Sequence, residues 1–132
     1  MPSFLSSAAA KPATKFVVVR EGTGNVLVTD LMLALDSATR RKGLLGRDGL
    51  PPQSGLIIAP SNAVHTFFMR FPIDVVFLAR TGEVLKICAA VGPRRVAACL
   101  RGFAVLEMPA GQAREAGLAR GERLRLEPAS ET

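Results

Sequence analysis

Short apolar segments follow one another along most of the chain, separated by polar or glycine-containing stretches. Segments of this length that are rich in Val, Ile, Leu and Phe are typical of β-strands. Hairpin turns are predicted at residues 21–25 and at Thr81-Gly82-Glu83. The pattern predicts strands over residues 15–20, 26–35, 55–60, 64–69, 73–80, 84–90, 95–100, 103–108 and 122–126.

Two segments have the pattern of short helices. Asp36 and Ser37 can cap free backbone N–H groups, and residues 38–45 are compatible with a helix that ends at Gly46. Residues 109–118 fit a second helix. Many closely spaced strands, two short helices and no regular alternation of strand and helix predict an α+β fold that is mainly antiparallel β, with a compact barrel-like sheet.

The composition of the chain predicts one globular domain over residues 15–127. Residues 1–14 are mostly small or polar and predict a flexible segment, and residues 128–132 predict a frayed tail. Hydrophobic residues make up 48% of the chain and charged residues 21%, as in globular proteins. No segment has the pattern of a secretory signal or of a membrane-spanning helix, so we expect a cytoplasmic protein without a transmembrane segment.

Positive charge is concentrated in the middle of the chain. Residues 37–101 hold ten Lys and Arg against three acids, a balance of +7. Arg40, Arg41 and Arg47 form the best candidate for an anion-binding group, because a guanidinium can bind carboxylate or phosphate through two parallel hydrogen bonds. Glu107 lies in an apolar segment, and a buried acid usually has a partner, so we expect one of these arginines to pair with it.

The segment from His65 to Leu78 contains the only histidine and a proline-linked acid. In a strand over 64–69, His65 and Met69 project to one face and Arg70 to the other. Asp74 follows Pro72 closely, so it can orient His65, bind Arg70 or anchor its own turn through backbone N–H groups. The last, structural interpretation is favoured over a catalytic pair.

Two alternative functions are less favoured. A hydrolase would use His65 with Asp74 or with Cys88, but Cys88 lies in an apolar segment where thiol reactivity is low. A nucleic-acid-binding protein would use the basic middle of the chain, but every Phe falls in an apolar segment and is expected in the core rather than on a stacking platform. Cys88 and Cys99 lack metal-site spacing, so no metal or cofactor is expected.

Four segments of the chain resemble, in order, the family of domain of unknown function 192 (DUF192). They are residues 40–47, 55–58, 65–78 and 105–111, and the resemblance extends over about residues 25–126. It implies a compact, mainly β domain with short helices from bacteria or archaea, with no established enzymatic activity. Many members carry a signal peptide or lipid anchor, which is not expected here. The Lys-Asn pair that often precedes the Pro-x-Asp motif is missing, and Leu45 replaces a Met.

These observations predict a non-catalytic domain that binds a small anionic ligand or a protein partner. No inference about the oligomeric state follows from the sequence. The predicted binding residues are polar or adaptable side chains embedded in apolar segments, together with the arginines: Arg40, Arg41, Arg47, His65, Met69, Arg70, Asp74 and Glu107.

Overall fold

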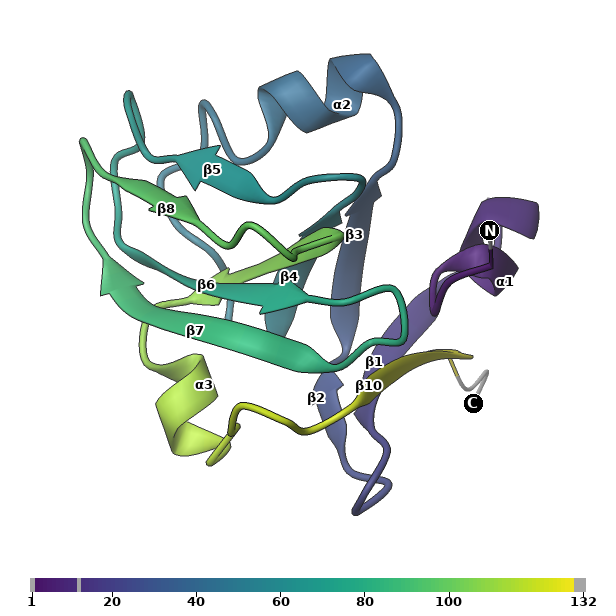
Figure 1. Ribbon diagram of the computed structural model, residues 1–132. Coiled ribbons are helices and arrows are strands. Elements are labelled where there is room, and N and C mark those ends of the chain that lie inside the picture. Colours follow the sequence, from purple (N-terminus) through teal and green to yellow (C-terminus); the bar gives the residue numbers. More distant parts are fainter. Residues whose placement is uncertain (1, 12, 130–132) are drawn as a thin grey trace.

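The computed structural model describes residues 2–11 and 13–129, which form three sheets and three short helices (Figure 1). The largest sheet has the strand order β3-β4-β9-β6-β7. Its strands are Asp30–Ala34 (β3), Ser54–Ile58 (β4), Ala104–Pro109 (β9), Ile73–Leu78 (β6) and Val84–Val91 (β7). All residues of β4 and β6 are buried, which explains why their sequences, apart from Ser54 and Asp74, are apolar rather than alternating.

One pair of strands in this sheet is parallel. The helix α2 (Ser37–Lys42) connects β3 to β4, which lie side by side in register from Asp30↔Ser54 to Ala34↔Ile58. As predicted, Asp36 caps α2, and its Oδ1 accepts a hydrogen bond of 2.8 Å from the Thr39 N–H. The helix ends at Lys42, earlier than predicted, because Gly43 leaves the helical conformation at φ +46°. This βαβ unit was not expected from the sequence.

A smaller sheet joins the two ends of the chain. It has the order β10-β1-β2, formed by Leu124–Pro128 (β10), Phe16–Arg20 (β1) and Val26–Val28 (β2). The segment 26–35, predicted as one strand, is therefore divided: Val26–Val28 pairs with β1, while Asp30–Ala34 belongs to the larger sheet. The turn predicted at residues 21–25 connects β1 to β2, and the one at 81–83 connects β6 to β7.

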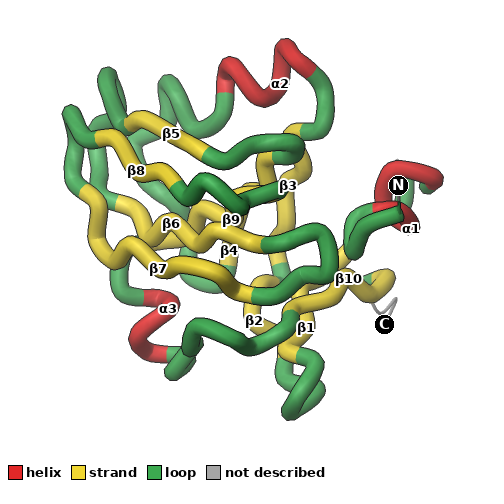
Figure 2. The backbone as a smooth tube through the Cα atoms, in the orientation of Figure 1, coloured by secondary structure: helices red, strands yellow, loops and turns green. Residues whose placement is uncertain are grey.

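Two buried clusters lie on opposite faces of the larger sheet. One face packs against the smaller sheet and the short helix α3 (Gln112–Glu115). The other is covered by α2 and by a two-stranded ribbon of Ala63–His65 (β5) and Val96–Ala98 (β8), as Figures 1 and 2 show. The ribbon and α2 thus form an outer layer above the sheet, and the candidate site lies between these layers.

The structure confirms a mostly antiparallel β protein and differs from the prediction in two respects. The sheets do not close into a barrel, so the barrel-like arrangement is not confirmed. A third short helix, α1 (Ser6–Ala10), lies in the segment predicted to be flexible, where Leu5 and Ala8 are buried in the core. Residues 130–132 of the predicted frayed tail lie outside the described residues. No helix in residues 2–11 and 13–129 is long and apolar enough to cross a membrane.

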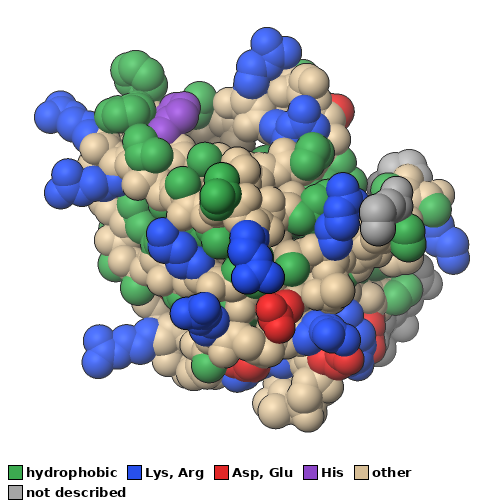
Figure 3. All heavy atoms as spheres, viewed as in Figure 1, with side chains coloured by type: hydrophobic (Ala, Val, Ile, Leu, Met, Phe, Trp, Pro, Cys, Tyr) green, Lys and Arg blue, Asp and Glu red, His purple; other side chains and the backbone are tan. Residues whose placement is uncertain are grey.

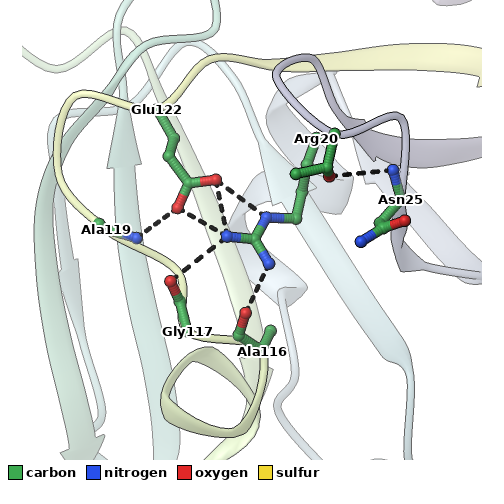
Figure 4. A network of polar contacts seen from close by, with 7 residues as sticks. Arg20, Asn25, Ala116, Gly117, Ala119 and Glu122 are labelled. Atoms are coloured by element: carbon green, nitrogen blue, oxygen red, sulfur yellow. Dashed lines mark hydrogen bonds and ion pairs between the residues drawn. The ribbon is translucent and has the colours of Figure 1, made fainter.

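An ion pair between Arg20 and Glu122 connects β1 to the segment that follows α3 (Figure 4). The Arg20 guanidinium donates two hydrogen bonds of 2.9 Å to the carboxylate of Glu122, and two more to the carbonyls of Ala116 and Gly117. The Ala119 N–H donates to the same carboxylate at 2.6 Å. Because the Arg20 side chain is only 16% exposed, water can replace little of this network.

Replacement of Arg20 by Met is expected to lower the free energy of unfolding by about 2 kcal/mol, between the losses typical of exposed and buried ion pairs. The matched control is Arg125→Met. Arg125 also pairs with a glutamate, Glu127, but both side chains are largely exposed, and its loss should cost about 0.5 kcal/mol or less. Urea unfolding followed by circular dichroism measures both, and equal losses would contradict this interpretation of the network.

Candidate functional site

A cavity of about 650 Å³ opens between the outer layer and the larger sheet, and we call it the α2–β5 cavity. Its walls come from α2 and the turn after it, from the end of β4, and from β5. Glu107 of β9 contributes the carboxylic acid. The lining residues are Ser37, residues 40–45, Ile58, Pro60, Ser61, residues 63–65, Met69 and Glu107.

Three consecutive cations of α2 line one wall of this cavity: Arg40, Arg41 and Lys42. Arg40 is half-buried and donates hydrogen bonds to the Leu35 carbonyl and the Ser37 hydroxyl, at 3.1 and 3.4 Å. The Nε of Arg41 donates to the Ser37 carbonyl at 3.3 Å. In residues 2–11 and 13–129, none of the three forms an ion pair with an acid, so they can bind an anion. Part of the charge of Arg40 acts on Asp36, whose pKa is lowered mainly by hydrogen bonds with Thr39 and to a smaller extent by this guanidinium.

Glu107 lies in the middle of the sheet, between Leu56 of β4 and Val75 of β6. It is 4% exposed, and no described residue donates a hydrogen bond to its carboxylate or forms an ion pair with it. The expected pairing with Arg40, Arg41 or Arg47 does not form in this part of the chain. Burial of the charged form raises the pKa of Glu107 from 4.5 to about 7.

His65 and Met69 also line the cavity, although the strand that was expected to hold both ends at His65. Residues 66–69 instead form a turn in which the buried Thr66 hydroxyl donates to the Gly92 carbonyl at 2.7 Å. Phe68 has a positive φ of +69°, so alternation along a strand does not determine these side-chain directions. The imidazole of His65 is exposed and contacts the ring of Phe67, with centroids 5.4 Å apart.

Asp74 lies outside the cavity lining and has a structural role. It is completely buried, and its Oδ1 accepts hydrogen bonds from the N–H groups of Ala90 and Gly111, at 2.8 and 3.2 Å. Its Oδ2 accepts one from the Ala113 N–H at 2.9 Å. Asp74 therefore anchors β7 and the start of α3, rather than its own turn, and it forms no hydrogen bond with His65 or Arg70 among the described residues.

The remaining predicted binding residues lie outside the cavity lining. The guanidinium of Arg70 pairs with the carboxylate of Asp48 at 2.7 Å on the surface, and Arg47 contacts the Sδ of Met32 at 2.9 Å. Cys88 and Cys99 are free, half-buried thiols that pack against the core. Among residues 2–11 and 13–129, no three His, Cys, Asp or Glu side chains come together as a set of metal ligands.

Sequence reasoning missed two features near the cavity. Lys42 lines it beside the two predicted arginines, and its position directly after them was a usable signal. Phe67 and Phe68, expected in the core, are 42% and 86% exposed. Figure 3 shows the histidine next to hydrophobic side chains at the surface, with Lys and Arg side chains spread over the same face. The premise that every Phe is buried was therefore wrong.

Comparisons with known proteins agree with this fold. The model of the DUF192 family, described as "Uncharacterized ACR", matches residues 17–126. A solved structure from Novosphingobium aromaticivorans DSM 12444, of unknown function, is 25% identical with a TM-score of 0.72, covering 83% of this chain and 82% of that one. A proposed transcription regulator from Sinorhizobium meliloti 1021 is 23% identical with the same TM-score, covering 83% and 90%. No curated protein matched the chain.

Proposed function

Because the chain belongs to the DUF192 family, whose members are described as uncharacterised, we propose a function from its cavity: it binds a small anionic ligand there without transforming it. The observation that carries this proposal is the alignment of Arg40, Arg41 and Lys42 along one wall of the α2–β5 cavity. Its volume of about 650 Å³ lies within the usual range for small-molecule sites.

The absence of a formed catalytic pair supports binding over catalysis. In the described part of the chain, His65 makes no hydrogen bond with Asp74 or with Cys88, the two partners that a hydrolase would use. Both oxygens of Asp74 already accept backbone N–H groups. Cys88 lies within β7 opposite Val75 and packs against the core, away from the cavity lining. A nucleophile and base within hydrogen-bond reach would be needed for covalent catalysis.

Binding of single-stranded nucleic acid is a second candidate, favoured by one observation. Phe68 is 86% exposed, and it lines a second cavity of about 700 Å³ together with Arg94. An exposed aromatic ring beside a guanidinium is the arrangement on which unpaired bases stack. One similar structure is that of a protein described as a proposed transcription regulator, and at 23% identity this likeness shows the fold alone.

A screen of the purified protein by thermal shift, with simple carboxylates, phosphates and an oligothymidine, tests both functions. We expect small anions to raise the melting temperature, and Arg41→Ala to weaken their binding about tenfold, because charge-assisted hydrogen bonds are lost. The control Arg120→Ala, in the turn after α3, should bind as the wild type does. Stabilisation by the oligothymidine alone, lost in Phe68→Ser, would favour the second candidate and contradict the first.

A further inference from the structure

We infer that the ligand of the α2–β5 cavity is a small zwitterion, with an anionic group bound by Arg40 and Arg41 and a protonated amine bound by Glu107. This inference rests on the proposed function and adds the chemical class of the ligand. It follows from a cavity lined by cations on one wall and by a single buried acid elsewhere.

The carboxylate of Glu107 is the unusual group in this cavity. Buried acids in proteins generally have hydrogen-bond donors or cationic partners, because an ionised carboxylate loses much of its hydration on burial. Glu107 is 4% exposed and has no such partner among the described residues, although three cations line the same cavity. No buried side-chain oxygen in the described part lacks both a partner and solvent contact, so this carboxylate reaches solvent through the cavity.

A ligand amine would supply the missing partner. Burial alone accounts for the raised pKa of Glu107, about 7, with no contribution from the arginines, so their charge does not compensate the acid. An ammonium group bound beside Glu107 would stabilise the ionised carboxylate through a charge-assisted hydrogen bond. An analogue without the amine would leave the carboxylate unpaired beneath it, which is the basis of strong discrimination between ligands.

Apolar side chains line the same cavity as these charged groups. Leu44, Ile58 and Val64 line the cavity, and Leu44 and Ile58 also belong to the buried cluster beneath the outer layer. Such a surface suits the methylene chain of a ligand whose charged groups lie at its two ends. The structure thus favours an ω-amino acid or a molecule of the same form over a ligand with anionic groups alone.

Isothermal titration calorimetry with matched compounds tests the inference at about pH 8, where a carboxyl of pKa about 7 is ionised. The probes are 4-aminobutyrate and 6-aminohexanoate, their deaminated counterparts butyrate and hexanoate, and butylamine and hexylamine. We expect at least one amino acid to bind about tenfold or more tightly than its deaminated counterpart. Glu107→Gln should abolish this preference, and Arg41→Ala should weaken the amino acid and the simple carboxylate alike.

The outcomes separate this inference from the proposed function. If simple carboxylates bind as tightly as the amino acids, and this binding requires Arg41 but not Glu107, anion binding stands and the zwitterion inference is overturned. If no probe binds, both are overturned. Because Glu107→Gln removes charge while keeping the shape of the side chain, Glu115→Gln on the surface of α3 serves as the matched control and should keep the wild-type preference.

Discussion

Replacement of Asp74 by Ala should lower the free energy of unfolding by about 4 kcal/mol, since three backbone N–H groups lose their acceptor and each unsatisfied buried donor costs about 1–3 kcal/mol. The donors belong to Ala90 in β7 and to Gly111 and Ala113 at the start of α3, two segments that are distant in the sequence. Loss of Asp74 therefore separates β7 from the start of α3. Gly111 has φ +92°, so this turn also depends on a residue without a side chain.

Urea unfolding followed by circular dichroism is a suitable measurement, because the chain contains neither Trp nor Tyr for fluorescence. Asp74→Asn should remain folded with a smaller loss, since its amide oxygen still accepts while its NH₂ group opposes an N–H donor. Asp48→Ala is the control: this acid is 85% exposed and pairs only with Arg70 on the surface, so a change below about 0.5 kcal/mol is expected. A loss at Asp74 no larger than at Asp48 would contradict the anchoring role.

Raising the pH from about 4.5 to above 7 should selectively destabilise the wild-type protein by about 3 kcal/mol relative to Glu107→Gln. Below pH 4.5 the Glu107 carboxyl is protonated in the folded and unfolded states, so it does not penalise folding. As the pH rises, the unfolded chain releases this proton first, because its pKa stays at about 4.5. The folded state releases it only near pH 7, so the contribution of Glu107 to the free energy of unfolding falls across this interval and is constant above it.

The difference in the free energy of unfolding between wild type and Glu107→Gln reports on this one carboxyl, since the two proteins share every other titrating residue. Unfolding curves without added ligand, recorded at several pH values between 4.5 and 8, give the difference directly. Glu115→Gln, which removes an exposed carboxyl, is the matched control for the loss of one negative charge. If the difference in the free energy of unfolding between wild type and Glu107→Gln does not change with pH, burial does not raise the pKa of this carboxyl.

Local signals in the sequence predicted the elements better than their assembly. The cap at Asp36 and the hairpin at residues 81–83 were recognisable because each is determined by a few neighbouring residues. The division of segment 26–35 was signalled only by the polar pair Thr29-Asp30. Which strand lies beside β3 depends on contacts distant in sequence, so the parallel pairing with β4 could not be predicted.

The same distinction applies to the candidate site. Five of the eight predicted binding residues line one cavity, namely Arg40, Arg41, His65, Met69 and Glu107, and their role in binding stays a prediction. Glu107 was noticed because an acid within an apolar strand is unusual in any fold. The sequence could not show that Asp74 binds N–H groups at positions 90, 111 and 113, because backbone donors are present at nearly every position.

During synthesis, the smaller sheet cannot form until β10 has left the ribosome, because β1 pairs with this strand from Phe16↔Pro128 to Arg20↔Leu124. The apolar β1 emerges early and stays unpaired with β10 while the strands of the larger sheet are being synthesised. The pairing of β1 with β10 therefore forms late, and the exposed edge of β1 is open to aggregation until then. A solubility-enhancing fusion partner is accordingly more useful at the N-terminus, where it is already folded while β1 awaits β10.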